Sequence, residues 1–253
     1  METVTVIING KECIAEKGEI LIDVAKRNGI AIPQLCHHES LRGQATCRIC
    51  IVEAIENGKK RVVTSCIFPV MRDMVVETNT EEIKRMRKTI LSFLKAEAPE
   101  NDKIELMTKA YGVGDYSRFE MNHGNDCVMC GLCVKACEEL GCNAISTINR
   151  GTTKKIATPY EEPSIECIGC GSCAYVCPTG CIKMEEGSGI RKIWGKEFKL
   201  LKCRECGRYF ITKEQYEYVN KKLDIPEELI CENCKKRLTA KKMMEIVNMK
   251  VTL

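Results

Sequence analysis

Nineteen cysteines in a chain of 253 residues are the side chains most able to do chemistry in this sequence. They fall into three groups that cysteine-free stretches separate. The first ten residues lack the basic region and the long apolar core of a signal peptide, and we therefore expect a cytoplasmic protein. Because cytoplasmic thiols stay reduced, so many cysteines favour metal ligation over disulfides.

The middle group repeats one spacing twice, at an offset of forty residues. Each copy reads Cys-x2-Cys-x2-Cys-x3-Cys, the pattern that binds 4Fe-4S clusters in bacterial ferredoxins, where the fourth cysteine ligates the cluster of the other copy. Two 4Fe-4S clusters are therefore predicted. The ligands of one are Cys127, Cys130, Cys133 and Cys177. The ligands of the other are Cys167, Cys170, Cys173 and Cys137.

The first group combines two single cysteines with one Cys-x2-Cys pair, which Gly43 precedes. Four thiolates suit a 2Fe-2S cluster, because each of its two irons takes two ligands. Zinc and scattered buried cysteines are the alternatives, but the ten-residue gap after the first cysteine and the hairpin and helix expected before it favour iron–sulfur. The predicted 2Fe-2S ligands are Cys36, Cys47, Cys50 and Cys66.

The last group consists of two Cys-x2-Cys pairs, twenty-four residues apart. Tetrahedral zinc on four thiolates stabilises small folds of this kind without a redox role, and one Zn²⁺ is predicted. A single iron of the rubredoxin type and a further 4Fe-4S cluster are the alternatives. The predicted zinc ligands are Cys203, Cys206, Cys231 and Cys234.

Three cysteines belong to none of these ligand sets. Both predicted 4Fe-4S clusters already have four ligands, so Cys142 and Cys181 are interpreted as small side chains packed beside the clusters, since free cysteine behaves as a small hydrophobe. An extra ligand or a redox-active thiol is the alternative. Cys13 is predicted to lie in the core.

Local signals predict the elements that position the first group. Asn9-Gly10 between two β-prone runs predicts a β-hairpin over residues 4–15. Apolar residues at helical spacing predict a helix over 20–27, which Asn28-Gly29 ends. The middle group is expected to contain short strands over 144–149 and 154–159.

Two helices are predicted after the first group. The pattern Thr78-x-x-Glu81 resembles a capping box at the start of one helix. Its predicted apolar stripe comprises Ile83, Met86, Ile90, Phe93 and Leu94. Pro99 ends this helix, and a second one is expected over 102–111. A further helix is expected over 212–223, between the two pairs of the last group.

These elements predict an α+β multidomain chain. Its expected parts are a plant-type 2Fe-2S ferredoxin β-grasp (1–78), a helical spacer (79–120), a bacterial 2×4Fe-4S ferredoxin domain (121–187) and a zinc-ribbon-like domain with a C-terminal helix (188–253). The formal net charge of +4 is too small to indicate nucleic acid binding. No apolar run approaches the roughly 18 residues of a membrane span.

The first group also carries a family resemblance. Cys36, Gly43, Cys47-Arg-Ile-Cys50-Ile-Val-Glu, Thr64-Ser-Cys66 and Met74-Val-Val-Glu-Thr resemble the 2Fe-2S domain that opens the large iron–sulfur subunit of complex I. The same stretch resembles the start of iron-only hydrogenases and of NAD-linked hydrogenase, formate dehydrogenase and transhydrogenase iron–sulfur subunits. These relatives usually hold a further 4Fe-4S cluster on one His and three Cys in the spacer. This chain has neither residue type between Cys66 and His123, so no cluster is expected there.

Three iron–sulfur clusters in one chain predict an electron path. No catalytic residue is assigned, because no Ser/His/Asp or Cys/His arrangement for nucleophilic catalysis can be identified. Gly112-Val-Gly114 lacks the third glycine and the strand and helix that flank a nucleotide-binding loop. The resemblance implies an electron-relay subunit between a flavin-containing, NAD(P)H-oxidising subunit and a hydrogenase, formate dehydrogenase or second flavoprotein. Some such assemblies bifurcate electrons and use ferredoxin. The alternatives are a free polyferredoxin shuttle and a redox-sensing interaction protein.

Overall fold

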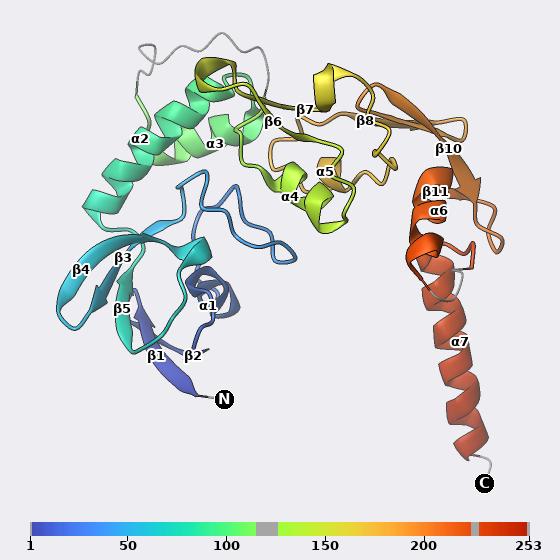
Figure 1. Cartoon of the computed structure of the whole chain (residues 1–253). Coiled ribbons are helices and arrows are strands. Elements are labelled where there is room, and N and C mark those ends of the chain that lie inside the picture. The colour runs from blue at the N-terminus through green and yellow to red at the C-terminus, as the bar shows by residue number, and fades with distance from the viewer. Residues whose placement is uncertain (1, 115–125, 224–227, 252–253) are drawn as a thin grey trace.

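The computed structural model describes residues 2–114, 126–223 and 228–251. Its N-terminal part is a five-stranded sheet with the order β2-β1-β5-β3-β4, in which β1 and β5 run parallel (Figure 1). The strands are β1 (Thr3–Ile8), β2 (Lys11–Glu16), β3 (Ile51–Glu56), β4 (Lys59–Thr64) and β5 (Met74–Glu77). Helix α1 (Leu21–Arg27) packs on this sheet, and the single turn η1 (Ser65–Ile67) follows β4.

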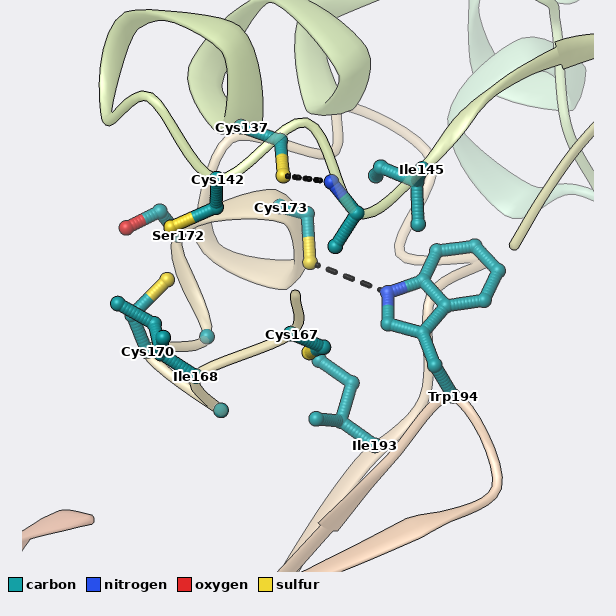
Figure 2. A pocket seen from close by; sticks show the side chains of 13 residues that line it. Cys137, Cys142, Ile145, Cys167, Ile168, Cys170, Ser172, Cys173, Ile193 and Trp194 are labelled. Atoms are coloured by element: carbon teal, nitrogen blue, oxygen red, sulfur yellow. Dashed lines mark hydrogen bonds between the residues drawn. The ribbon is translucent and has the colours of Figure 1, made fainter. Parts of the chain in front are cut away.

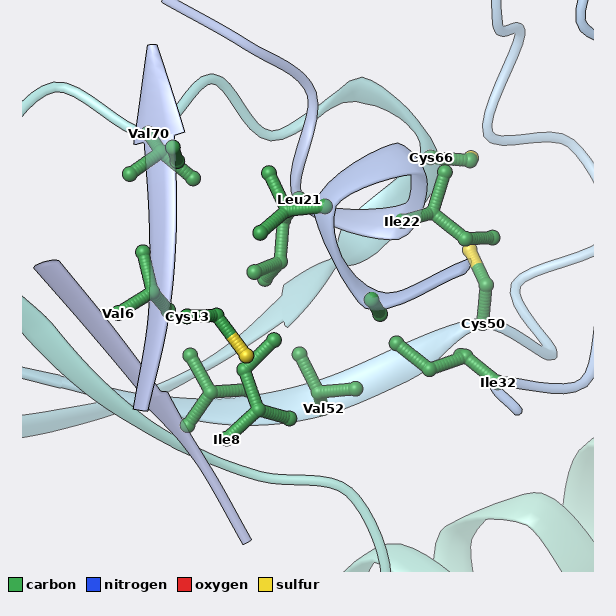
Figure 3. Close-up of a cluster of buried hydrophobic side chains, with 14 of the residues drawn as sticks. Val6, Ile8, Cys13, Leu21, Ile22, Ile32, Cys50, Val52, Cys66 and Val70 are labelled. Atoms are coloured by element: carbon green, nitrogen blue, oxygen red, sulfur yellow. The ribbon is translucent and has the colours of Figure 1, made fainter. Parts of the chain in front are cut away.

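Both hairpins of this sheet turn on an Asn-Gly pair. The predicted hairpin at Asn9-Gly10 is confirmed, with φ of 49° and 79°, and Asn57-Gly58 makes a second one. Such turns need positive φ at both central residues, which Asn and Gly tolerate. The predicted helix is confirmed as α1. Cys13 points from β2 into the core beside Val6 and Ile8, as expected (Figure 3).

Two helices follow the sheet, as predicted: α2 (Glu81–Glu97) and α3 (Asp102–Tyr111). The predicted cap at Thr78 is wrong, because Thr80 Oγ1 accepts the hydrogen bond from Ile83 N that caps α2. The Thr78 hydroxyl instead accepts a hydrogen bond from Asn9 Nδ2 at 2.8 Å, which fixes the chain to the first hairpin. Residues 115–120 of the expected spacer and His123 lie outside the described residues.

The middle part has two short helices and a small two-stranded sheet. Helices α4 (Leu132–Glu139) and α5 (Ser172–Tyr175) contact each other, and each begins directly after a left-handed glycine, Gly131 or Gly171. The two predicted strands are confirmed as β6 (Ser146–Ile148) and β7 (Lys155–Ala157). Single turns η3 (Gly151–Thr153) and η4 (Pro159–Glu161) flank β7.

The C-terminal part is a four-stranded sheet of order β11-β10-β9-β8, followed by two helices. Its strands are β8 (Met184–Gly187), β9 (Ile190–Ile193), β10 (Lys196–Lys202) and β11 (Tyr209–Thr212). The expected boundary at 187–188 therefore falls in the β8–β9 hairpin turn. Helix α6 (Lys213–Lys222) confirms the helix predicted over 212–223, and α7 (Glu232–Val251) extends away from the remainder of the chain (Figure 1). Among the described residues, no helix is long and apolar enough to cross a bilayer.

Candidate metal centres

The N-terminal site brings together the four cysteines predicted as 2Fe-2S ligands. Three lie in the loop between α1 and β3, Cys66 lies on η1, and all four are buried. The thiols of Cys47 and Cys66 donate hydrogen bonds to Cys36 and lower its pKa to about 2. Cys66 likewise lowers the pKa of Cys50 to about 6. The same hydrogen bonds raise the pKa of the two donors, Cys47 and Cys66, so only a bound cation would keep all four sulfurs thiolates.

The backbone of this loop is shaped around the thiols. Cys47 N donates a hydrogen bond to Cys36 Sγ at 3.4 Å. Ala45 and Arg48 have φ of 53° and 57°, a conformation that costs energy for residues with a side chain. Gly43 itself lies against the backbone carbonyl of Cys66. The loop and η1 are thus held together by direct backbone contact.

Gly43→Ala is expected to damage the N-terminal site. The added Cβ would collide with the carbonyl oxygen of Cys66, so one of the two ligand-bearing segments must shift. Overpacking of this kind costs about 1–3 kcal/mol of folding free energy. Urea unfolding should show that loss, together with a lower content of the 2Fe-2S cluster. Gly114→Ala is the control, because an added Cβ there has no neighbour within 4 Å. Equal stability of the two variants would contradict the prediction.

Arg87 is a residue of this site that sequence reasoning missed. It is fully buried on α2, where Nε and Nη2 donate hydrogen bonds to the carbonyls of Ile49 and Ile51 at 3.1 and 2.6 Å. These carbonyls flank Cys50. Nη1 also donates to Asn79 Oδ1 and to Tyr111 Oη, and burial lowers the pKa of Arg87. The guanidinium therefore ties the ligand loop to both spacer helices.

The buried face of α2 explains why Arg87 was missed. The predicted stripe is one residue out of phase over part of the helix: Phe93 is 52% exposed, whereas Leu91 is buried. The buried set of the helix is Ile83, Arg87, Leu91, Leu94, Lys95 and Ala96. An arginine at a four-residue spacing from Ile83 and Leu91 is the signal that could have revealed it.

The middle part contains two thiol-lined cavities, here called site A and site B. The cysteines lining site A are Cys127, Cys130, Cys133, Cys177 and Cys181. The cysteines lining site B are Cys137, Cys142, Cys167, Cys170 and Cys173 (Figure 2). Each cavity therefore contains three cysteines of one sequence copy and the fourth of the other copy. This is the crossed grouping that the repeat predicts.

Corresponding backbone turns shape the two sites. Met129 and Gly169 occupy the same position in the two Cys-x2-Cys-x2-Cys runs, and both have positive φ. Backbone N–H groups of Met129 and Ala144 donate to Cys127 Sγ and Cys137 Sγ at 3.4 and 3.2 Å. Burial raises the pKa of Cys133 to about 12, so a bound cation is needed to keep this sulfur a thiolate. The donor sets fit sulfur-ligated clusters.

Each site also contains one of the cysteines left over from the ligand sets. Cys181 Sγ lies 3.6 Å from Cys177 Sγ in site A, and Cys142 is buried beside site B. Ala144-Ile145 lines site B, and Cys181-Ile182 lines site A. Cys181 in site A therefore takes the place that Ala144 has in site B. This placement agrees with small packed side chains, and their interpretation as non-ligands stays a prediction.

Two apolar clusters link the three sites, and each cluster contains a cysteine of site A. Cys36, Cys47 and Cys130 belong to one buried cluster, which connects the N-terminal site with site A. Cys133 and Cys173 belong to the next buried cluster, which connects site A with site B. Polar contacts reinforce the first junction: Gln44 Nε2 donates to the Gly131 carbonyl, and Asn101 Nδ2 donates to the Thr179 carbonyl.

The C-terminal site gathers the last four cysteines, two from the turn between β10 and β11 and two from the start of α7. Their sulfurs, in Cys203, Cys206, Cys231 and Cys234, all lie within 4.8 Å of one another. Four sulfurs about 2.3 Å from one tetrahedral ion stand roughly 3.8 Å apart. The separation of the Cys206 and Cys231 sulfurs is 3.8 Å. This geometry suits one ion and is too tight for a 4Fe-4S cluster.

Positive side chains and backbone donors surround these sulfurs. Arg208 Nη2 donates to Cys231 Sγ and Arg237 Nη2 donates to Cys234 Sγ, both at 3.7 Å. Burial opposes ionisation of Cys203, but the backbone N–H groups of Cys231 and Cys206 lower its pKa to about 6. Two guanidiniums match the double negative charge of one divalent ion on four thiolates.

Comparisons with known proteins identify the domains that contain the N-terminal and middle cysteine groups. Residues 1–81 match a family described as a 2Fe-2S iron-sulfur cluster binding domain, and residues 122–184 match a 4Fe-4S dicluster domain. The NADP-reducing hydrogenase subunit HndD of Solidesulfovibrio fructosivorans is 31% identical over 74% of this chain. The mitochondrial NADH-ubiquinone oxidoreductase 78 kDa subunit of Neurospora crassa is 30% identical over 71% of this chain. The chain is an iron–sulfur subunit related to these proteins.

A solved structure extends the similarity to the fold. The NAD+-reducing NiFe hydrogenase in its H2-reduced state aligns with a TM-score of 0.59 and 25% identity, covering 70% of this chain and 86% of that one. This iron–sulfur subunit spans only part of its sequence relatives: the alignments cover 37% of the length of HndD and 27% of the 78 kDa subunit. Neither family match reaches the C-terminal site, which lies beyond residue 184.

Proposed function

We propose that this chain is an electron-relay subunit of a multisubunit NAD(P)H-linked oxidoreductase. The observation that carries the proposal is the row of three thiol sites, which two apolar clusters link through site A. In this proposal Cys36, Cys47, Cys50 and Cys66 hold a 2Fe-2S cluster. Cys127, Cys130, Cys133 and Cys177 hold one 4Fe-4S cluster, and Cys167, Cys170, Cys173 and Cys137 hold the other. Bound there, the clusters supply one-electron redox chemistry.

The protein's own groups prepare these sites for electron transfer. Apolar side chains such as Leu91 and Leu132 fill the space between the N-terminal site and site A and keep water out of it. Amide donors to Cys36, Cys127 and Cys137 stabilise negative charge on the sulfurs. The proposed order along the chain's interior is the N-terminal site, site A and site B.

The partners follow from the relatives. The matched proteins are named as a subunit of an NADP-reducing hydrogenase and a subunit of NADH-ubiquinone oxidoreductase. We therefore assign catalysis to other chains: a flavin-containing subunit that oxidises or reduces NAD(P)H, and a second redox subunit such as a hydrogenase, a formate dehydrogenase or another flavoprotein. Electron bifurcation with ferredoxin is part of this proposal, as is a cytoplasmic location.

The C-terminal site is proposed to hold one structural Zn²⁺. The tight grouping of its sulfurs and its two arginines support a single divalent ion, and the position at the base of α7 supports a structural role. A single iron would fit the same sulfurs, and metal analysis separates the two. We further propose the β-grasp, spacer, ferredoxin and zinc-ribbon-like arrangement expected from the sequence, with β8 assigned to the last unit.

The function is tested by anaerobic purification of the full tagged chain. We expect a flavin-containing partner to copurify and NAD(P)H to bleach the iron–sulfur absorption of the complex. A matched purification of Cys130→Ser, which lacks one site A ligand, should retain the partner and lose part of the bleaching. A chain that binds no flavoprotein and stays oxidised with NAD(P)H would contradict the proposal.

A further inference from the structure

Site B is closed by a hairpin from the C-terminal sheet, outside the ferredoxin-like repeat. Three residues of the β9–β10 hairpin contact the ligand-bearing segments of site B. Arg191 Nη1 donates to the Gly169 carbonyl at 2.6 Å, and Lys196 Nζ donates to the Cys167 carbonyl at 2.9 Å. Between them, Trp194 Nε1 donates to Cys173 Sγ at 3.4 Å (Figure 2). The hairpin therefore contacts both the Cys167-x2-Cys170 segment and the sulfur of one predicted ligand, Cys173.

The backbone at Trp194 indicates that its side chain is needed there. Four hairpins of the described structure turn on a non-glycine residue followed by glycine, both with positive φ. These turns are Asn9-Gly10, Asn57-Gly58, Ser188-Gly189 and Trp194-Gly195. Asparagine is the residue that this turn favours, and a bulky aromatic residue at φ 53° is strained. The contacts of the indole side chain with the thiol sites offset this backbone strain.

The contacts of the indole are specific to the thiol sites. Trp194 lines the cavities of both site A and site B, and it packs with Cys133 and Cys173 in the same apolar cluster. Its N–H is directed at one sulfur, Cys173 Sγ. A hydrogen bond to a ligand sulfur stabilises the more negative, reduced state of a cluster and raises its reduction potential.

We propose that Trp194 is a positioning residue for site B, which raises the reduction potential of the cluster there through its N–H bond to Cys173 Sγ. The C-terminal sheet then has an electrochemical role besides its structural one. The inference rests on the proposed function, because it needs a 4Fe-4S cluster in site B. It goes beyond that function by naming a residue outside the cysteine ligands that sets one potential of the row.

The direct test uses the single tryptophan of the chain. Full-length protein with clusters is produced with nitrogen-15 tryptophan and reduced, and electron spin-echo spectroscopy is recorded. We expect a nitrogen-15 coupling on one 4Fe-4S signal and none on the 2Fe-2S signal. The absence of that coupling from both 4Fe-4S signals would overturn the proposal. Since no partner is involved, failure here is distinguishable from failure of the relay function, which leaves the coupling intact.

A variant tests the effect on potential. Trp194→Phe keeps an aromatic ring and removes the N–H, so one 4Fe-4S potential should shift to a more negative value while the 2Fe-2S potential stays unchanged. Tyr209→Phe on the same sheet is the matched control and should shift neither. A merely structural role would alter the unfolding midpoint of Trp194→Phe and leave both 4Fe-4S potentials in place, and that result would refute the proposal.

Discussion

Cys203→Ser is expected to abolish metal binding at the C-terminal site and to unfold the two Cys-x2-Cys segments that form it. Among the residues that the structure describes, the apolar cluster around this site comprises three of its own cysteines with Phe210 and Ile230 packed against them, which is too little to fold without an ion. Structural zinc in small knuckles contributes roughly 10–16 kcal/mol of apparent folding free energy. Metal analysis should show the loss of one zinc per chain, and limited proteolysis should cleave between residues 203 and 234.

The iron content should survive this substitution. Ile193 and Phe198 pack beside site B, so β9 and β10 stay anchored at their other end. Cys142→Ala is the matched control, because this cysteine is predicted to be no ligand and the variant should retain all iron and zinc. A Cys203→Ser protein that keeps zinc at the wild-type ratio would show that the site does not bind the ion through these sulfurs.

Arg87→Met is expected to destabilise the N-terminal part by about 3–5 kcal/mol, because buried carbonyls of Ile49 and Ile51 lose a charged donor. Each unsatisfied carbonyl costs about 1–3 kcal/mol. The same change frees the loop that carries Cys50, so the 2Fe-2S cluster should be lost faster. Urea unfolding followed by circular dichroism measures the first effect, and the decay of visible absorption measures the second.

Arg85→Met provides the control on the same helix. Arg85 is exposed, and surface substitutions of this kind stay within about 0.5 kcal/mol. Comparable unfolding midpoints for Arg87→Met and Arg85→Met would mean that the buried guanidinium does not brace the ligand loop.

The cysteine groups could be read from the sequence because their spacing is local. A Cys-x2-Cys run brings its sulfurs together in one turn, so Cys127 and Cys130 reveal their site without knowledge of the fold. The hairpin at Asn9-Gly10 and the helix ending before Asn28-Gly29 are local for the same reason. The predicted sets of the middle and C-terminal groups lie together in space, and their role as ligands stays a prediction.

The residues that support the sites could not be found in this way. Arg87 binds backbone carbonyls some thirty-six residues away, and Trp194 reaches a sulfur twenty-one residues away. The carbonyls that Arg87 binds have no sequence pattern, since any residue has a carbonyl. The cysteine run that contains Cys173 does not indicate which distant side chain donates to its sulfur. The spacing Thr78-x-x-Glu81 matches a capping box and so favours Thr78 as the cap of α2. Thr80 is the residue that caps the helix, while Thr78 binds Asn9 of the distant first hairpin.

The most direct test of the relay is a potentiometric titration of the anaerobically prepared full chain, followed by electron paramagnetic resonance. About ten irons per chain are expected, as one 2Fe-2S and two 4Fe-4S clusters. Because the three sites form a row, the reduced spectrum should show one 2Fe-2S signal and two 4Fe-4S signals, with magnetic interaction between the sites A and B. A single 4Fe-4S signal, or two without interaction, would contradict a continuous path through this subunit.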